Sequence, residues 1–403
     1  MVIGIIGAGA SGMAAAIRAS QNPQNQILLF ERQARVGRKL QATGNGRCNL
    51  TNLHADPSHY HGAEPLFCAP ALERFSVRKT LSWFSSMGLF TTVEDSGRVY
   101  PYSDQANSVV DILRFALEKP NISLISGFEV SRVQVCPQGF LIRGSQDYPC
   151  DKLIVACGGL ASTKLGGSIS GYQILRSLGH KMTRLRPSLV QLKTRWDGNT
   201  SLKGVRANCK AEILRVGAPF AESTGEIQFT EYGISGPVIF EISRDVCEGP
   251  GPWECRLDLL PEVTEEALYS ALTKKSTGNL TCENLLTGIL HNRLGRVLCQ
   301  QAGLNPHVPI HSLSEGSLHT VCRLVKNLTI PLTEPLGMES AQVTAGGMVT
   351  SQFDSNTMES RLLPGLYACG EVLDIDGDCG GFNLQWAWSS GNLAGASAGG
   401  TNL

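Results

Sequence analysis

The first 31 residues limit the fold more than any other part of the chain. Residues 2–6, VIGII, form a short apolar run that is typical of a buried parallel strand. Residues 7–12, GAGASG, match the pattern G-x-G-x-x-G, and the alanine-rich stretch MAAAIRAS that follows favours a helix. A second apolar run, 27–30, ends at Glu31, whose carboxylate suits the ribose hydroxyls of an adenosine. This order predicts a Rossmann-like α/β domain that binds a dinucleotide.

Each residue of the glycine pattern has a predicted task. Gly7 permits the tight turn, Gly9 lets the backbone approach a pyrophosphate, and Gly12 allows close packing of helix and strand. The helix N-terminus at Ala10 and Ser11 offers N–H groups and a partial positive charge to the phosphates. NAD and FAD fit this fingerprint equally well.

Later stretches favour FAD. Residues 129–135 and 139–144 alternate like half-buried antiparallel strands, and the apolar run 151–159 ends in Gly-Gly. These predict a small β-meander that returns to the parallel sheet. Residues 365–381 predict a short strand followed by an acidic, glycine-rich turn in which Asp374 and Asp376 are solvated.

A last helix is predicted over residues 383–399. Ala387, Gly391, Ala394 and Ala398 recur at helical spacing, and this stripe of small residues predicts close approach to the sheet. The helix N-terminus, near Gly381, directs N–H groups at an anionic flavin ring. A nucleotide site formed from both ends of the chain suits a long ligand such as FAD.

Composition excludes several classes of function. Among the 403 residues, Lys+Arg and Asp+Glu both number 35, so the chain lacks the basic excess of most polyanion-binding proteins. We therefore expect a small-molecule substrate and no nucleic acid. No apolar run approaches the roughly 20 residues that span a bilayer, and the N-terminus lacks a basic region, so we expect a cytoplasmic protein without membrane insertion.

The cysteines and histidines suggest no metal site. The 13 cysteines are odd in number and contain no C-x-x-C pair, and the eight histidines form no ligand cluster. We interpret the cysteines as mostly reduced core thiols, and we predict no catalytic metal.

The middle of the chain predicts a separate, inserted domain. Residues 1–187 and 336–403 are assigned to FAD binding, and 188–335 to the substrate. Strand-like runs in 188–262 predict a β-barrel or sandwich, and apolar spacing in 263–326 predicts helices. The strand-like runs are 189–194, 210–216, 226–230, 237–242 and 255–260, and the helical stretches are 264–274, 283–301 and 315–327. No second G-x-G-x-x-G stands between strand and helix, so NAD(P)H is expected to bind transiently beside the flavin.

Six stretches carry a resemblance to a known family. They are GAGASGMAAA, ERQARVGRKLQATGNGRCNLTN, GRVYPYSDQANSVVDIL, GISGPVIF, VTAGGM and GEVLDIDGDCGGFNLQWAWSSGNLAG. Together they resemble the BaiN-type family of FAD-dependent oxidoreductases, which includes proteins described as aminoacetone oxidases. The resemblance implies an α/β, Rossmann-like FAD-binding domain of the two-dinucleotide-binding type, made from both chain ends, with an inserted β-barrel-like and helical domain.

Motifs and resemblance together suggest a set of cofactor-binding residues. The set is Gly7, Gly9, Ala10, Ser11, Gly12, Glu31, Arg32, Lys39, Thr43, Gly44, Asn45, Arg47, Cys48, Val130, Gly158, Gly370, Glu371, Gly381, Phe382, Asn383 and Leu384. Within it, Glu371 is expected at the ribityl or pyrophosphate part of FAD. Cys48 has no partner at C-x-x-C spacing, so we favour packing over a redox role.

Three residues are candidates for catalysis. The Arg47 guanidinium binds a phosphate or a substrate oxyanion, and the Tyr100 and Tyr102 hydroxyls are usable proton donors beside the substrate. Two stretches depart from the family pattern and leave the substrate open. Thr163 and Ser170-Gly171 stand in place of a proline and a GDG turn, and Glu231 stands where a histidine is common.

The favoured function is an NAD(P)H-driven reduction of an activated C=C bond in a 3-oxo-Δ4,6 bile-acid intermediate. Hydride passes through the flavin to the β-carbon, and a tyrosine or water protonates the α-carbon. One alternative is oxidation of aminoacetone or a similar small amine by O2. Another is a flavoprotein that acts with an RNA or protein partner. The sequence leaves the oligomeric state open.

Overall fold

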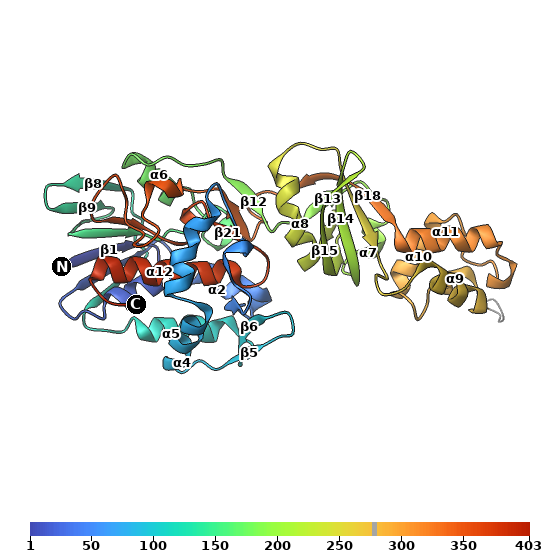
Figure 1. Ribbon diagram of the computed structural model, residues 1–403, viewed down its shortest axis with the longest axis horizontal. Coiled ribbons are helices and arrows are strands. Elements are labelled where there is room, and N and C mark those ends of the chain that lie inside the picture. Colours follow the sequence, from blue (N-terminus) through green and yellow to red (C-terminus); the bar gives the residue numbers. More distant parts are fainter. Residues whose placement is uncertain (276–279) are drawn as a thin grey trace. The chain divides into compact units, whose positions relative to one another are not determined.

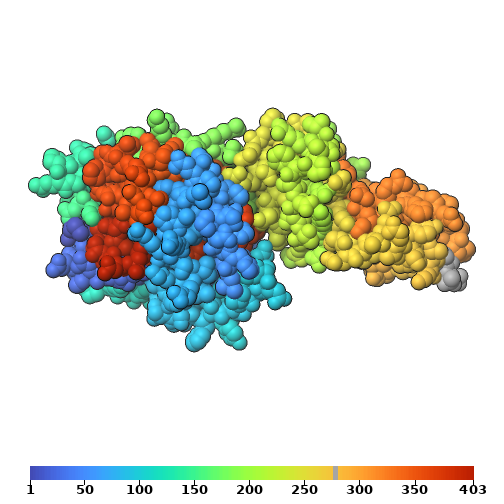
Figure 2. All heavy atoms as spheres, viewed as in Figure 1, coloured from blue at the N-terminus to red at the C-terminus, as the bar shows by residue number. Residues whose placement is uncertain are grey.

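The chain folds into two compact units, each held together by its own internal contacts. The computed structural model describes residues 1–275 and 280–403. One unit consists of Met1–Arg186 and Gln342–Leu403, and the other of Pro187–Ala341. In the first unit, blue atoms from N-terminal segments and red atoms from C-terminal segments lie side by side on the surface, as Figure 2 shows.

A five-stranded parallel sheet is the centre of the first unit (Figure 1). Its order, β20-β11-β1-β2-β7, places the first strand in the middle and a C-terminal strand at one edge. The strands are β1 Val2–Ile6, β2 Gln26–Glu31, β7 Ile122–Ser126, β11 Lys152–Val155 and β20 Leu366–Ala368. Helix α1, Ala10–Ala19, joins β1 to β2. The predicted Rossmann-like arrangement is confirmed.

The β-meander has one strand more than predicted. It contains β8 Arg132–Cys136, β9 Gly139–Arg143 and β10 Asp147–Cys150, in the order β10-β9-β8. Sequence patterns missed β10 because Asp147 and Pro149 disfavour strands. Within this sheet β10 is an edge strand, where proline is tolerated.

Helix α12, Phe382–Gly399, packs most closely on α1, and it also contacts the sheet as predicted, where Lys152 Nζ of β11 donates to the Ala398 oxygen at 2.9 Å. A Cβ on Gly391 or Gly395 would lie 2.4 Å from the backbone oxygen of Ser11 or Ala15, respectively. Glycines on α12 thus face the small residues of α1, and this lets the two helices approach until their backbones touch. The packing fixes the C-terminal helix beside the N-terminal glycine turn.

Short elements complete the first unit. The strands are β3 Thr51–Asn52, β4 Tyr60–His61, β5 Thr91–Val93, β6 Arg98–Pro101, β19 Val343–Ala345 and β21 Asp376–Gly377, with β12 Arg186–Ser188 at the boundary. The helices are α2 Arg38–Ala42, α3 Ala69–Arg74, α4 Val77–Ser86, α5 Ala106–Ala116 and α6 Ser170–Ser177.

The second unit contains a closed barrel of six strands, which confirms the predicted β-barrel-like domain. Its order is β13-β16-β15-β14-β17-β18. The strands are β13 Leu192–Thr194, β14 Arg206–Arg215, β15 Ala218–Phe229, β16 Gly233–Ser235, β17 Trp253–Asp258 and β18 Leu328–Pro335. The helices are α7 Asn199–Leu202, α8 Pro237–Glu248, α9 Glu265–Lys274, α10 Asn292–Gln301 and α11 Glu315–Lys326.

Two local predictions in this unit are wrong. Residues 237–242 begin helix α8 and form no strand, because Pro237 suits the first helical turn and Val238, Ile239, Ile242 and Val246 are buried at helical spacing. Of the predicted helix 283–301, only Asn292–Gln301 is α-helical. Residues 276–279 of the predicted helical range lie outside the described residues.

Candidate functional site

Of the three glycines in the G-x-G-x-x-G turn, two are packed against other backbone atoms and one, Gly9, faces open space. A Cβ on Gly7 would lie 2.5 Å from the Ala156 oxygen, and one on Gly12 would lie 1.8 Å from the Gly7 oxygen. At Gly9, which precedes the first residue of α1, no atom of the described residues lies within 4 Å of such a Cβ. The packing of the unit itself therefore requires Gly7 and Gly12, whereas Gly9 leaves room for a phosphate at the helix N-terminus.

Glu31 and Arg32 are anchored beside this turn. The Glu31 carboxylate accepts hydrogen bonds from the backbone N–H groups of Ala8 (2.9 Å) and Gln33 (2.8 Å). The Arg32 guanidinium donates to the Gly166 oxygen at 3.1 Å. The carboxylate is thus held at the end of β2, next to the expected adenosine position, whereas Arg32 is engaged by the protein.

An ion pair joins the two chain ends. Lys39 Nζ lies 2.8 Å from Glu371 Oε2, and Glu371 Oε1 accepts a hydrogen bond from the Thr344 N–H at 2.8 Å. Gly370 lies against α1, since a Cβ there would be 2.5 Å from Ser11 Oγ. These contacts bring the predicted C-terminal cofactor residues to the start of α1.

The loop that contains Thr43 to Cys48 has an unusual backbone. Gly44, Asn45 and Cys48 have φ values of 58°, 57° and 64°. Asparagine tolerates this left-handed conformation, but cysteine rarely adopts it, and such strain is concentrated at functional sites. Thr43 Oγ1 donates to the Leu40 oxygen at 2.7 Å, which closes the start of the loop. The side chain of Asn45 is exposed.

Cys48 is a packing residue by its environment. Its side chain is fully buried, and burial raises the pKa of the thiol to about 12. The reactive thiolate is therefore scarce at neutral pH. Val130, before β8, is also buried, and Gly158, after β11, has a φ of 69°.

Arg47 is held by two carboxylates above an aromatic ring. Its guanidinium donates to Asp104 and, at 3.0 Å, to Glu94, and it lies 3.9 Å from the centre of the Tyr100 ring. The hydrogen bond to Asp104 is the main reason why the pKa of Arg47 is raised. The structure thus brings Arg47 and Tyr100 together. Tyr102 is 77% exposed and remains a candidate by sequence alone.

Tyr100 is buried, and this burial raises the pKa of its hydroxyl. The side chain therefore stays protonated at neutral pH and can donate a hydrogen bond or a proton.

The first turn of α12 is tightly fixed. Gly381 has a φ of 104°, and a Cβ there would lie 2.5 Å from the Thr51 backbone. The side chain of Asn383 makes two hydrogen bonds to the backbone of Gly377. Its Oδ1 atom accepts from the N–H group at 2.8 Å, and its Nδ2 atom donates to the C=O group at 2.7 Å, so Asn383 shapes the turn. Phe382 stacks on His59 with ring centres 4.4 Å apart, and Leu384 is partly buried.

A cluster of two histidines and an aspartate was missed by sequence reasoning. His59 Nδ1 lies 2.8 Å from Asp378 Oδ2, and His61 Nε2 lies 2.6 Å from Asp378 Oδ1. Although burial opposes it, the hydrogen bonds to His61 and His59 hold the pKa of Asp378 below its ordinary value. The spacing H-x-H was the available signal, because alternate residues of an extended segment share a face.

The nearby aspartates are not solvated as predicted. Asp374 and Asp376 are 3% and 0% exposed. Asp376 belongs to β21, which pairs with β4, and this pairing draws the turn inward.

Asn49 was also missed. Its Oδ1 atom is buried and has no hydrogen-bond partner among the described residues. A Cβ on Gly381 would lie 2.9 Å from this atom. A buried acceptor without a partner beside the first turn of α12 indicates that a ligand group is accommodated there.

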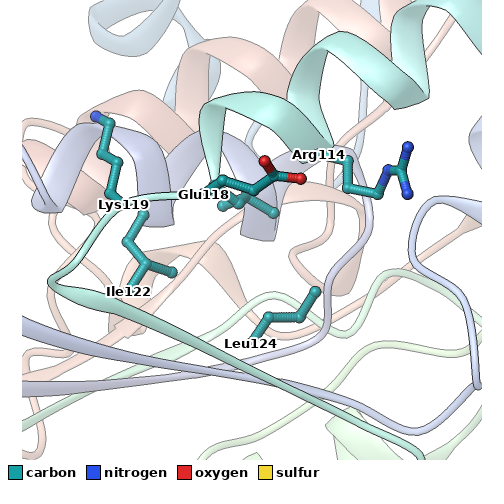
Figure 3. A pocket seen from close by; sticks show the side chains of 6 residues that line it. Arg114, Glu118, Lys119, Ile122 and Leu124 are labelled. Atoms are coloured by element: carbon teal, nitrogen blue, oxygen red, sulfur yellow. The ribbon is translucent and has the colours of Figure 1, made fainter.

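A surface hollow lies elsewhere and takes no part in this site. It has a volume of about 400 Å³ and is formed where α5 ends and β7 begins. Figure 3 shows Arg114 and Glu118 near the end of α5, with Ile122 and Leu124 of β7 close by. None of its six lining residues belongs to the predicted cofactor set.

Within residues 1–275 and 280–403, no group of three or more His, Cys, Asp or Glu side chains is arranged to hold a metal ion. Among the helices described, none is long and apolar enough to cross a bilayer.

A family model and full-length relatives match the chain. The model, described as the HI0933-like protein Rossmann domain, matches residues 1–397. The chain is 40% identical over 403 residues to a 3-dehydro-bile acid delta(4,6)-reductase of Clostridium scindens, covering 98% of each protein. It is 34% identical over 392 residues to the ribosomal RNA dihydrouridine synthase of Escherichia coli, covering 96% of this chain and 95% of that protein.

Solved flavoenzymes share the fold at low sequence identity. A 3-ketosteroid delta1-dehydrogenase from Sterolibacterium denitrificans gives a TM-score of 0.53 at 12% identity over 99% of both chains. A flavocytochrome c3 fumarate reductase gives a TM-score of 0.50 at 14% identity, covering 100% of this chain and 78% of the other. Within the described residues, the open space at Gly9 and the Asn49 oxygen without a hydrogen-bond partner fit the dinucleotide FAD. The chain therefore belongs to the HI0933-like family and is an FAD-dependent oxidoreductase.

Proposed function

We propose that this chain is an NAD(P)H-driven reductase of an activated C=C bond, and that its substrate is a 3-oxo-Δ4,6 bile-acid intermediate. The observation that carries the proposal is the 40% identity, along 98% of both proteins, to a 3-dehydro-bile acid delta(4,6)-reductase. The dihydrouridine synthase relatives support the reaction type, because dihydrouridine arises by saturation of a C=C bond conjugated to a carbonyl group. A steroid-like dienone contains the same conjugated unit.

Bound FAD supplies the hydride chemistry of this reaction. The N–H groups at the start of α1 bind its pyrophosphate beside Gly9, and Glu31 binds the adenosine ribose. The Lys39–Glu371 pair holds the two chain ends together around the cofactor. The remaining residues of the cofactor set are proposed to bind FAD as the sequence predicts.

Arg47 and Tyr100 are the residues we assign to the substrate. The Arg47 cation stabilises negative charge that develops on the substrate carbonyl oxygen. Burial raises the pKa of the Tyr100 hydroxyl, so Tyr100 stays protonated. Either Tyr100 or a water molecule supplies the proton to the α-carbon. We assign substrate recognition to the unit Pro187–Ala341 and place the protein in the cytoplasm, where NAD(P)H is available.

The charges of the second unit favour a small molecule over RNA. Pro187–Ala341 contains 14 lysines and arginines against 17 aspartates and glutamates, a formal net charge of −3. Several of its bases are paired across the barrel strands, for example Arg206 with Glu226 at 3.3 Å and Lys210 with Glu222 at 2.9 Å. A polyanion gains little attraction from such a surface.

The test is an anaerobic reaction followed through the flavin absorbance. The holoenzyme is bleached with NADH or NADPH, and a 3-oxo-Δ4,6 bile acid is added, with the saturated 3-oxo bile acid as control. We expect only the dienone to restore the flavin colour, with loss of its own ultraviolet absorbance. Rapid recolouring by air, with the dienone unchanged, would contradict the proposal and favour the amine oxidase.

RNA is the second candidate because of the 34% identity to a ribosomal RNA dihydrouridine synthase. Unmodified ribosomal RNA is added to the bleached enzyme in a parallel sample. Recolouring by RNA with formation of dihydrouridine, and binding that weakens steeply with salt, would support this candidate in place of the bile acid.

A further inference from the structure

We propose that Asn49 binds the flavin end of FAD, with its side-chain oxygen accepting a hydrogen bond from an N–H or O–H group of the cofactor. The proposal rests on FAD binding and is independent of which substrate the enzyme reduces. Asn49 is 9% exposed, and its Oδ1 atom has no partner among the described residues. A buried amide oxygen without a hydrogen bond destabilises the protein unless a ligand or ordered solvent satisfies it.

The neighbouring polar side chains are satisfied by the protein. Thr51 Oγ1 donates to Gln385 Oε1 at 2.6 Å, and Asn52 Nδ2 donates to the Gly380 oxygen at 2.9 Å. Both bonds connect the segment after Cys48 to the start of α12. Asn49 lies in the same segment, yet its oxygen makes no such bond to any residue that the structure describes. The missing partner is therefore particular to Asn49 and is not a general feature of this interface.

The position of the oxygen connects two parts of the predicted flavin site. A Cβ on Gly44, in the left-handed loop, would lie 2.9 Å from the Asn49 backbone nitrogen. A Cβ on Gly381, which precedes α12, would lie 2.9 Å from Asn49 Oδ1. Both glycines therefore pack closely against Asn49, and a larger residue at either position would displace it. The two glycines hold Asn49 between the left-handed loop and the start of α12.

The polar groups here complement the edge of a flavin. Among the described residues, no side chain caps α12, so N–H groups of its first turn are hydrogen-bond donors. The pyrimidine edge of the isoalloxazine ring has one N–H group, N3–H, between two carbonyl groups. Backbone donors from α12 match the carbonyls, and the Asn49 oxygen is an acceptor for the N–H. A ribityl hydroxyl is the other donor at this end of FAD.

The decisive variant is Asn49→Leu, which keeps the branched shape of the side chain and removes the polar group. We expect the FAD dissociation constant to rise at least about tenfold, because a hydrogen bond to the cofactor is lost. We also expect the apoprotein to melt at a higher temperature than wild type, because its unsatisfied carbonyl is gone. A residue with a merely structural role would instead lower the melting temperature of the apoprotein.

The matched control is Asn199→Leu in the barrel unit. Asn199 is similarly buried, with 6% of it exposed, but unlike Asn49 it has a partner: its Nδ2 atom donates a hydrogen bond to Thr194 Oγ1 at 2.7 Å. This variant should lower the apoprotein melting temperature and leave the FAD dissociation constant unchanged. If Asn49→Leu binds FAD as tightly as wild type, or if its apoprotein melts lower like the control, the proposal is wrong.

Two further measurements keep the proposal testable if Asn49→Leu does not fold. Asn49→Asp retains the acceptor but adds a negative charge, so it should bind FAD and lower the flavin midpoint potential; an unchanged potential would overturn the proposal. N3-methyl-FAD identifies the donor. If N3–H is the donor, this analogue binds wild type about tenfold more weakly than FAD does. If a ribityl hydroxyl is the donor, the two bind alike.

Discussion

Replacing Gly9 by alanine separates cofactor binding from folding. In the described residues, nothing lies within 4 Å of a Cβ at this position, and the φ of Gly9 is −81°, which alanine adopts freely. The cost to the apoprotein is the small difference between glycine and alanine before a helix, about 1 kcal/mol or less. The added methyl group would occupy the space left for the pyrophosphate. We expect FAD affinity to fall at least tenfold, or about 1.4 kcal/mol.

The same substitution at Gly12 is the comparison. A Cβ there would lie 1.8 Å from the Gly7 oxygen, whereas real Cβ contacts are essentially never closer than 3.0 Å. Helix α1 and the glycine turn must therefore separate by more than an ångström. Because α1 is also packed tightly on α12, this movement disturbs the centre of the unit. We expect Gly12→Ala to cost about 3 kcal/mol or more of unfolding free energy.

Thermal melting of the apoproteins and fluorescence titration with FAD measure both effects. Gly9→Ala should melt like wild type and bind FAD weakly, and Gly12→Ala should melt at a much lower temperature. If Gly9→Ala loses as much stability as Gly12→Ala, or binds FAD as tightly as wild type, the open space has no role in cofactor binding.

Three other predictions follow from the site. Cys48 is buried and its pKa is raised to about 12, so it should resist alkylation at pH 8 in the native protein. The variant Cys48→Ser should still show flavin reduction. Fast alkylation with loss of activity would instead indicate a redox role for Cys48. Arg47→Ala should change the free energy of unfolding by less than about 1 kcal/mol, because the ion pairs of Arg47 with Glu94 and Asp104 are solvent-exposed. The same variant should raise the substrate KM or the FAD dissociation constant about tenfold. Unchanged binding of both substrate and FAD would show that Arg47 is not part of the site. The lowered pKa of Asp378 means that its bonds to His59 and His61 stabilise the fold above the ordinary aspartate pKa of about 3.9 and that this stability is lost as the pH falls below it. Asp378→Asn should therefore flatten the acid side of the stability–pH profile, whereas the exposed control Asp147→Asn should not, and equal profiles for the two variants would contradict this reasoning.

Patterns spanning few residues predicted the local structure well where two signals agreed. The strand, glycine turn and helix of residues 2–19 were confirmed because apolar runs and glycines each fix the backbone locally. Residues 237–242 were misassigned because the β-branched and aromatic side chains favour a strand, whereas burial on one side of Pro237–Glu248 favours a helix. Tertiary packing decided between them.

The sequence by itself determined the dinucleotide fold, the inserted barrel-containing region and the use of both chain ends, because these depend on periodicity and on glycine conformations that neighbouring residues fix. Only the tertiary structure showed that α12 lies on α1, that Asp378 bonds two histidines more than 300 residues away, and that the Asn49 oxygen has no partner in the described chain. Such contacts depend on which distant segments meet. A single sequence does not encode that meeting in any local pattern.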